Sequence, residues 1–360
     1  MSLTKILIAY SSKPPILEYL ERSFTKMGME VGKFYSDNNH WFDRYCIRHI
    51  NKQAHNLRIL PKEKNFFKDY PLAHLNYRSS RLLKAVEAFS PDLVLMVRGI
   101  RFRKETLEEI RKRAVLFGWW IEREERMEEA FNEISIVDHY FFMNSSAVEE
   151  GARREYSNKV SLLLHAVDPY IFHPIDCGKL YDWCFVGGWS EKRQEYIEKA
   201  IEVSPSGIVY GPRWRKKNLL KRRISKVIEG SYLYGKDLTR LYSETKVVLN
   251  VTNWGFGEGE KRSGINMRIL EVPACKAFLL TDGSRDIRNV VTPGKDLAVY
   301  EGINDFKDKL AHYINNDEER ERIALSGFRH VTGHYTYDNV VRKIIKTYVR
   351  RERPLAQVGI

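Results

Sequence analysis

The stretch YDWCFVGGWSEKR, residues 181–193, has the pattern of a buried strand that leads through two glycines into a helix. Gly187 and Gly188 end the apolar run and leave room for a ligand near the backbone. Ser190 is a typical helix cap, and Arg193 lies in the first turn of the helix that we expect over residues 191–203. Free backbone N–H groups at such a helix end attract phosphate. The stretch therefore predicts an anion site at a strand end, with a plain strand-to-helix turn as the alternative.

Similar apolar runs occur on both sides of this stretch, and segments with the hydrophobic periodicity of a helix separate most of them. They occur at residues 5–12, 93–97, 114–121, 138–144, 207–211, 246–252, 276–282 and 296–300. Continuous apolar runs are typical of strands that are buried on both faces of a parallel sheet. The order of strands and helices predicts the α/β class, with two doubly wound Rossmann-like domains that face a cleft.

The segment VDPYIFHP, residues 167–174, contains two prolines that disfavour helix on either side, and we interpret it as a linker. The expected domains are therefore an N-terminal Rossmann-like domain over residues 1–166 and a C-terminal domain over residues 175–336. A basic helix and tail over residues 337–360 is expected to pack back on the N-terminal domain. Residues 40–80 are aromatic and basic without a clear period, and they predict no element.

The composition bounds the function. With 360 residues, 43% hydrophobic and 30% charged, the chain has the profile of a soluble globular protein, which excludes disorder and a miniature disulfide scaffold. The formal net charge of +13 favours phosphates or acidic lipid as partners. The four cysteines form no C-x-x-C pair, so no zinc or redox site is indicated. No signal peptide or membrane span is recognised, and a cytoplasmic location is expected.

A second cluster of chemically versatile residues follows the apolar run at 246–252. Residues 250–257 form a glycine-rich loop, and a helix is expected over residues 266–274. Arg268 and Glu271 lie three residues apart and therefore share one face of that helix. This spacing suits a joint contact with a ligand, and it equally suits an intrahelical salt bridge.

The segment NMRILEVPACKAFLLTD, residues 266–282, resembles the helix–strand signature of group-1 glycosyltransferases, most closely that of the CgeB-type (spore-maturation) branch. WWIE (119–122), CFVGGWSEKR (184–193) and VYGPRW (209–214) match in the expected order, within a resemblance that extends over about residues 90–345. The resemblance implies a B-type glycosyltransferase fold. Its C-terminal half would bind a nucleotide-diphosphate sugar, and its N-terminal half would bind the acceptor.

The resemblance also implies roles for single residues. Glu271 would bind the ribose hydroxyls, Arg193 and Arg268 would face the pyrophosphate, and Tyr210 and Gly211 would lie near the base. The nucleotide-sugar-binding residues predicted in this way are Gly187, Gly188, Arg193, Tyr210, Gly211, Asn266, Arg268 and Glu271. No cofactor and no metal are implied, because basic groups would offset the charge of the leaving diphosphate.

Two positions depart from the family pattern. Ser263 stands where the retaining enzymes of the broader group carry a second glutamate, so the stereochemical outcome stays open. Lys276 replaces a glycine that usually follows the signature helix.

Glu122, which follows the apolar run at 114–121, is the predicted general base that would take a proton from an acceptor hydroxyl. The alternative is a solvated residue of the charged run EREERMEE, residues 122–129. The expected partners are a nucleotide-sugar donor and an unidentified acceptor, which is a glycan, a lipid-linked molecule or a protein.

The basic segment 212–223, which includes Trp214, adds peripheral contact with an anionic membrane as a hypothesis, against a merely solvated helix. Two further function classes stay open. One is a nucleic-acid-binding protein, for which the cations and aromatic residues at 40–80 and 212–223 speak, but no zinc-finger or RNP-like motif supports it. The other is a catalytically silent nucleotide-binding relative.

Overall fold

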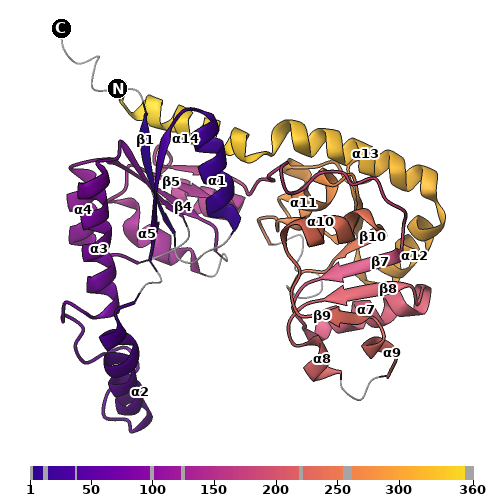
Figure 1. Ribbon diagram of the computed structural model, residues 1–360, viewed down its shortest axis with the longest axis horizontal. Helices are drawn as coiled ribbons and strands as arrows, with labels where there is room; N and C mark the ends of the chain where they lie inside the picture. The colour runs from indigo at the N-terminus through magenta and orange to yellow at the C-terminus, as the bar shows by residue number, and fades with distance from the viewer. Residues whose placement is uncertain are drawn as a thin grey trace. The chain divides into compact units, whose positions relative to one another are not determined.

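The computed structural model describes residues 3–10, 15–36, 39–97, 101–122, 126–218, 222–253 and 262–352. The chain divides into two compact units, of which the first comprises Met1–Leu163 with Val341–Ile360 and the second Leu164–Val340. Each unit contains a six-stranded parallel sheet with helices packed on it (Figure 1). The predicted α/β class with two doubly wound units is confirmed.

The sheet of the first unit has the strand order β2-β1-β3-β4-β5-β6. Its strands are β1 (Lys5–Tyr10), β2 (Glu30–Tyr35), β3 (Leu93–Val97), β4 (Val115–Trp120), β5 (His139–Phe142) and β6 (Val160–Leu162). Every residue of β3 is buried, as its uninterrupted apolar sequence predicts. By contrast, β2 lies at the sheet edge and has one buried residue, so its mixed sequence gave no strand signal.

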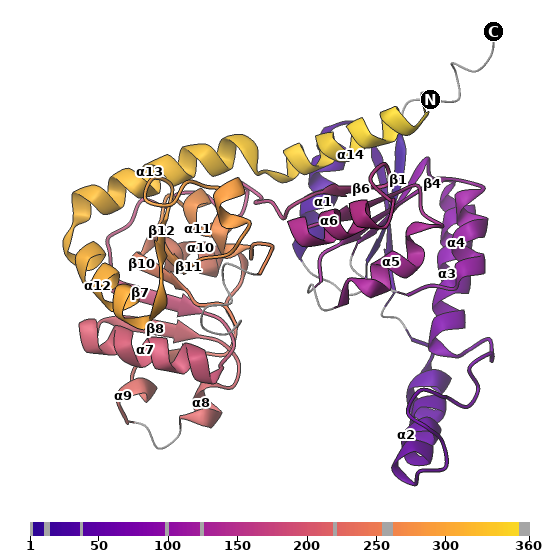
Figure 2. The same ribbon diagram turned by 180° about the vertical axis from the view of Figure 1, so that it is seen from behind.

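The helices of the first unit cover the sheet, apart from α2, which lies well away from it (Figures 1 and 2). They are α1 (Pro15–Lys26), the π-helical turn η1 (Asp43–Ile47), α2 (Arg48–Asn56), α3 (His74–Phe89), α4 (Lys104–Arg111), α5 (Glu128–Ile134) and α6 (Ser145–Arg153). Residues 40–80, for which the sequence predicts no element, thus contain η1, α2 and the first part of α3.

The sheet of the second unit has the strand order β12-β11-β10-β7-β8-β9. Its strands are β7 (Tyr181–Val186), β8 (Gly207–Tyr210), β9 (Ile228–Gly230), β10 (Thr245–Asn250), β11 (Phe278–Asp282) and β12 (Ala298–Tyr300). The chain adds β8 and β9 on one side of β7 and then crosses over to build β10 to β12 on the other. This reversal places a topological switch point between β7 and β10, where ligands of doubly wound sheets bind at the carboxyl ends.

Helices cover both faces of this second sheet (Figure 2). They are α7 (Glu191–Val203), α8 (Trp214–Lys217), α9 (Arg222–Ser225), α10 (Gly235–Ser243), α11 (Arg268–Ala274), the 3-10 turn η3 (Ile287–Asn289), α12 (Gly302–Asn315) and α13 (Asp317–His334). Trp183, Val247 and Phe278 from three neighbouring strands are buried in one core cluster with helical residues. Full burial of such a side chain contributes about 1.5–3 kcal/mol.

The terminal helix α14 (Tyr337–Glu352) starts in the second unit and continues into the first. Within the first unit, the Lys343 ammonium donates a hydrogen bond to the carbonyl of Leu162 at 2.5 Å, and Arg351 donates one to the carbonyl of Asn158. None of the helices in the described residues combines the length and the apolar character needed to cross a membrane.

Candidate functional site

Two glycine loops meet at the carboxyl ends of β7 and β8. The amide of Gly187 donates to the carbonyl of Tyr210 at 2.8 Å, and the indole N–H of Trp214 donates to the carbonyl of Gly187 at 2.7 Å. A Cβ atom on Gly211 would lie 1.9 Å from the carbonyl oxygen of Gly187, so only glycine allows this approach. The structure thus brings together the loops predicted at 187–188 and 210–211.

We expect Gly211→Ala to destabilise the second unit by more than about 2 kcal/mol, because the added methyl group pushes the two loops apart and strains the Trp214 hydrogen bond. Gly178→Ala is the matched control, since a Cβ atom at Gly178 has no atom within 4 Å. Urea unfolding of both variants measures the effect. Equal stability of the two would contradict the close approach of the loops.

Arg268 spans the switch point of the second sheet. Its Nε donates to the carbonyl of Val186 at the end of β7 at 3.0 Å, and its Nη1 donates to the Asn250 side-chain oxygen at the end of β10 at 3.1 Å. Asn266 supports it, because its Oδ1 accepts from the Arg268 amide and its Nδ2 donates to the same Asn250 oxygen, both at 3.1 Å. The helix expected from residue 266 starts at Arg268 instead, and Asn266 precedes it as a loop residue.

Arg193 approaches the same strand ends from the first turn of α7. Ser190 caps this helix, since its hydroxyl accepts from the Arg193 amide at 3.3 Å, as the sequence predicts. The guanidinium of Arg193 donates from Nε to the carbonyl of Val251 and from Nη1 to that of Gly188, both at 2.8 Å. Burial and the neighbouring charge of Arg268 lower the pKa of Arg193 to about 10.

The two guanidiniums therefore form a concentrated positive site. Both side chains are partly buried and have only neutral oxygens as hydrogen-bond partners, and neither has a carboxylate partner among the described residues. Two positive charges repel each other more strongly when they are partly buried, and a bound dianion would relieve that repulsion. The arrangement suits a diphosphate.

Glu271 lies one helical turn after Arg268 and is 7% exposed. Burial raises the pKa of its carboxyl group to about 7, and the charge of Arg268 opposes this shift. The alternative of an intrahelical salt bridge is not found, because the described structure contains no ion pair between Arg268 and Glu271. Since Arg268 acts on Glu271 only through its charge and forms no ion pair with it, the Glu271 carboxylate retains its capacity to accept hydrogen bonds from a ligand.

Several residues that were not predicted from the sequence complete this edge of the sheet. The Asn250 side chain links β10 to Thr281 at 2.8 Å, and the Tyr300 hydroxyl donates to the backbone carbonyl of Asn250 at 3.1 Å. Lys192 pairs with Asp282 at 3.3 Å. Asn250, Asp282 and Tyr300 are each the last residue of a strand, and the rule that ligands bind at carboxyl ends could have identified them.

Lys276, which stands where the family pattern has glycine, lies directly after the end of α11. Lys276 is exposed and has a φ of 54°, in the left-handed region that usually holds the glycine after a helix. Its amide donates to the carbonyl of Pro273 at 2.8 Å, which closes the helix end. The lysine therefore keeps the glycine conformation at a cost.

We expect Lys276→Gly to raise the free energy of unfolding by about 1 kcal/mol, because glycine adopts this conformation without the clash of a Cβ atom. Lys295→Gly is the control, since Lys295 is also exposed in a turn but has no positive φ. Thermal unfolding compares the two. A loss of stability in Lys276→Gly would rule out backbone strain at this position.

Glu122 lies in the first unit, two residues after the end of β4, whereas the other predicted site residues lie in the second. Its side chain is 17% exposed and lies 3.6 Å from the guanidinium of Arg126. It is therefore partly buried rather than a freely solvated member of a charged run. Its role as general base stays a prediction.

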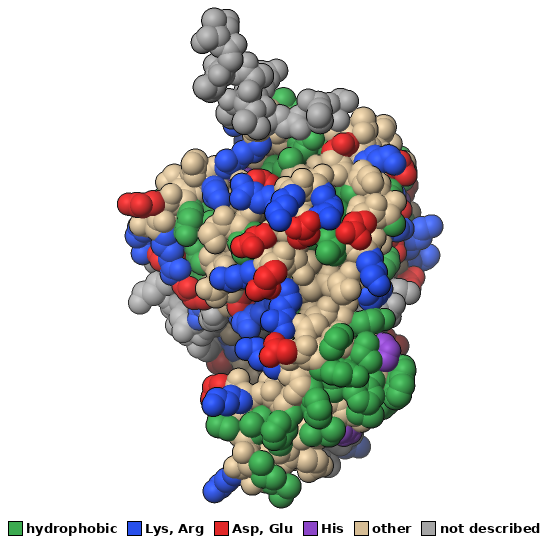
Figure 3. All heavy atoms as spheres, turned by 90° about the vertical axis from the view of Figure 1, so that its left-hand side faces the viewer, with side chains coloured by type: hydrophobic (Ala, Val, Ile, Leu, Met, Phe, Trp, Pro, Cys, Tyr) green, Lys and Arg blue, Asp and Glu red, His purple; other side chains and the backbone are tan. Residues whose placement is uncertain are grey.

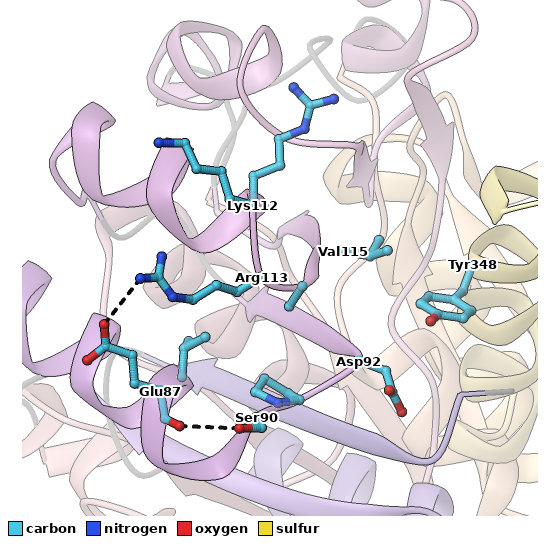
Figure 4. A pocket seen from close by; sticks show the side chains of 11 residues that line it. Glu87, Ser90, Asp92, Lys112, Arg113, Val115 and Tyr348 are labelled. Atoms are coloured by element: carbon cyan, nitrogen blue, oxygen red, sulfur yellow. Dashed lines mark hydrogen bonds and ion pairs between the residues drawn. The ribbon is translucent and has the colours of Figure 1, made fainter. Parts of the chain in front are cut away.

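A pocket of about 580 Å³ opens elsewhere in the first unit, at the amino ends of β3 and β4 (Figure 4). Its cations are matched by acids: Arg113 faces Glu87 at 3.5 Å, and Lys112 pairs with Glu109 at 2.8 Å. The pocket lies at the opposite edge of its sheet from Glu122. Among the described residues, no three His, Cys, Asp or Glu side chains gather in a way that would hold a metal ion.

Comparisons with known proteins show what the sequence and the fold are similar to. The sequence pattern of the family described as "Glycosyl transferase-like" matches residues 193–346, which include Arg193, Arg268 and Glu271. Similar solved structures are a glycosyltransferase from Rickettsia africae ESF-5 (12% identity, TM-score 0.67, covering 98% of this chain and 99% of that one) and sucrose-phosphate synthase from Thermosynechococcus elongatus (13%, 0.65, 96% and 98%). Anabaena HepE, solved with UDP-glucose, is a third (11%, 0.63, 96% and 99%). These structures show that the chain has the B-type glycosyltransferase fold, and the family match shows a glycosyltransferase domain that covers most of the second unit.

The sequence narrows the relationship further. Spore protein CgeB from Bacillus subtilis (strain 168) is 24% identical over 274 residues, which cover 73% of this chain and 84% of that protein. The resemblance to the CgeB-type branch is confirmed.

Proposed function

We propose that this glycosyltransferase takes its sugar from a nucleotide-diphosphate donor held at the carboxyl edge of the second sheet. The observation that carries the proposal is the pair of guanidiniums of Arg193 and Arg268, which are partly buried beside the switch point and have no carboxylate partner among the described residues. They would bind the diphosphate and stabilise the negative charge that develops as the sugar leaves. The backbone amide of Gly188 and the first turn of α7 would add N–H donors.

Glu271 would bind the ribose in the same proposal. Its carboxylate can accept hydrogen bonds from two vicinal hydroxyls, and its burial strengthens each of them. The loop with Tyr210 and Gly211, which contacts Gly187, would lie beside the base. Glu122 would act as general base toward the acceptor hydroxyl.

Calorimetry with UDP, GDP, ADP and dTDP tests donor binding, and UDP-glucose is the first donor to try because HepE was solved with it. We expect one of these diphosphates to bind with a favourable enthalpy, as charge-assisted hydrogen bonds to the phosphates would give. We also expect the enzyme to hydrolyse the corresponding nucleotide sugar slowly when no acceptor is present. Unchanged turnover in the presence of EDTA would support catalysis without a metal. Absence of binding to every diphosphate would overturn the proposal, and binding without hydrolysis would favour a silent relative.

The basic segment 212–223 gives weaker support for membrane contact than its sequence suggests. Trp214, the aromatic residue that would anchor it, is fully buried and donates its hydrogen bond to Gly187. Nearby, the Lys217 ammonium lies 4.8 Å from the ring of Trp189, and Arg215 contacts the carbonyl of Glu229. These two cations therefore contact other parts of the second unit. Residues 219–221 lie outside the described residues, and membrane contact through this segment stays a prediction.

A further inference from the structure

The segment between β2 and α3 has an unusual distribution of polar and apolar side chains. This segment, residues 39–73, contains η1 and α2 and lies well away from the sheet of the first unit (Figures 1 and 2). Its inner side holds Asp43 and Asn51, which are 2% and 8% exposed, together with Ile47 and Ala54. Its large apolar side chains point mainly outward.

Polar contacts rather than apolar packing hold this segment in shape. The Asp43 carboxylate accepts from the Arg48 guanidinium at 2.8 Å and from the His74 amide at 3.0 Å. Asn51 exchanges two hydrogen bonds with the backbone of Phe66, at 2.7 and 3.3 Å. The loop after α2 is thereby fixed to the helix, so the outward position of its aromatic residues is a built feature.

Five aromatic rings form a connected series across the segment. The ring centroids are 5.7 Å apart from Trp41 to Phe42, 5.9 Å from Phe42 to Tyr70, 6.4 Å from Tyr70 to Phe67 and 6.5 Å from Phe67 to Phe66. Phe67 has a φ of 60°, which is unfavourable for a bulky residue. We call these five residues the aromatic surface.

Further large apolar side chains of the same segment are exposed. Trp41, Leu57 and Ile59 are 64%, 68% and 64% exposed, and Tyr45 and Ile50 are also exposed. Figure 3 shows hydrophobic side chains gathered on the lower part of the molecule in that view, with Lys and Arg beside them. A soluble protein seldom exposes so many large apolar groups together unless they contact a partner.

The charges around the aromatic surface identify the kind of partner. Residues 39–73 contain seven Lys and Arg against three Asp and Glu. Asp43 is paired with Arg48, and Asp69 is paired with Arg103 at 2.9 Å. Glu63 is the one acid in the segment outside these pairs. Exposed cations beside outward Trp, Tyr and Leu side chains match a membrane interface, where rings lie at the headgroup level and cations meet anionic lipid.

We propose that the aromatic surface of residues 39–73 binds the protein to an acidic lipid membrane. Exposed aliphatic residues such as Leu57 and Ile59 offer no ring on which a base could stack, and the aromatic rings contact each other rather than stand free for stacking, so a lipid surface fits better than single-stranded RNA or DNA. The proposal does not depend on the donor site, because the residues concerned lie in the first unit.

Sedimentation with phosphatidylcholine vesicles, with and without phosphatidylglycerol, tests the proposal. We expect the wild-type protein to sediment with the acidic vesicles, and the variant Trp41→Ser/Leu57→Ser to lose at least about tenfold in vesicle affinity. The matched control is Tyr170→Ser/Leu180→Ser, which removes side chains of 65% and 61% exposure from the second unit and should sediment like the wild type. Lys52→Glu/Lys62→Glu should bind less tightly, and added salt should reduce the difference.

Thermal unfolding and nucleoside diphosphate binding should be unchanged in Trp41→Ser/Leu57→Ser, which separates loss of the membrane surface from misfolding or failure of the donor site. Wild-type protein that stays in the supernatant with acidic vesicles would overturn the proposal. So would a light-scattering mass that shows two copies joined through this surface, or single-stranded RNA binding that the Trp41→Ser/Leu57→Ser variant loses.

Discussion

Replacing Glu271 by glutamine is expected to stabilise the protein above neutral pH and, at the same time, to weaken its binding of nucleoside diphosphates. Burial raises the pKa of Glu271 from 4.5 to about 7 in the folded state. Between these values the unfolded chain releases the proton and the folded chain keeps it, so the carboxyl group costs stability as the pH rises. Above pH 7 this cost is on the order of 3 kcal/mol. Glutamine cannot ionise and avoids the cost.

Urea unfolding across the pH range measures the stability effect as the difference between variant and wild type. We expect a small difference near about pH 5 and the full gain near about pH 8. Nucleoside diphosphate affinity should fall by about 10- to 100-fold, because the ribose would lose hydrogen bonds to a charged acceptor. Calorimetry provides that comparison.

Glu133→Gln is the matched control for this experiment. Glu133 lies in α5 of the first unit, and burial raises its pKa to about 8 against the opposing charges of Arg101 and Arg78. This variant should show a similar gain in stability at high pH with no change in nucleoside diphosphate affinity. A Glu271→Gln variant that binds as tightly as the wild type would remove Glu271 from the donor site.

Arg268→Lys is expected to reduce affinity for the nucleoside diphosphate by about 100-fold while leaving the affinity for the corresponding nucleoside nearly unchanged. Lysine keeps the charge, but its single ammonium cannot contact Val186, Asn250 and a phosphate in the geometry of the guanidinium. The diphosphate-to-nucleoside affinity ratio, measured by calorimetry, isolates the contribution of the phosphates. Equal losses for both ligands would indicate a general structural defect instead.

Arg240→Lys is the control for this second prediction. Arg240 lies on α10, which precedes the amino end of β10, and its side chain is 69% exposed. It pairs with Glu244 at 2.8 Å and is not part of the proposed donor site. We expect its variant to bind both ligands like the wild type. The comparison distinguishes the position of Arg268 from a general effect of replacing arginine by lysine.

The sequence allowed the sheets to be predicted well, because strands buried on both faces must be continuously apolar. LVLMV at β3 is an example in which local sequence and burial agree. The edge strand β2, EVGKFY, contains charged residues because solvent accepts them there, so no pattern marked it. Residues 39–73 escaped prediction for the opposite reason: their apolar side chains face outward, which removes the periodicity that burial imposes.

The site was predictable to the extent that its residues occur in contiguous motifs. Gly187, Gly188 and Arg193 belong to one stretch, and Asn266, Arg268 and Glu271 to another. Asn250 was quoted as part of a loop, yet its link to both Asn266 and Arg268 emerges only when β10 is placed beside β7. At Lys276 a departure from the family pattern does not change the backbone, because the lysine adopts the left-handed conformation that glycine usually has there.

The close pair of guanidiniums at Arg193 and Arg268 also has a practical consequence for handling this protein. Any multivalent oxyanion would relieve their repulsion, so we expect sulfate and inorganic phosphate in purification buffers to compete with a diphosphate for the proposed site. Donor affinities measured in such buffers would be underestimated. We expect crystals grown from ammonium sulfate to show an ion beside these two guanidiniums.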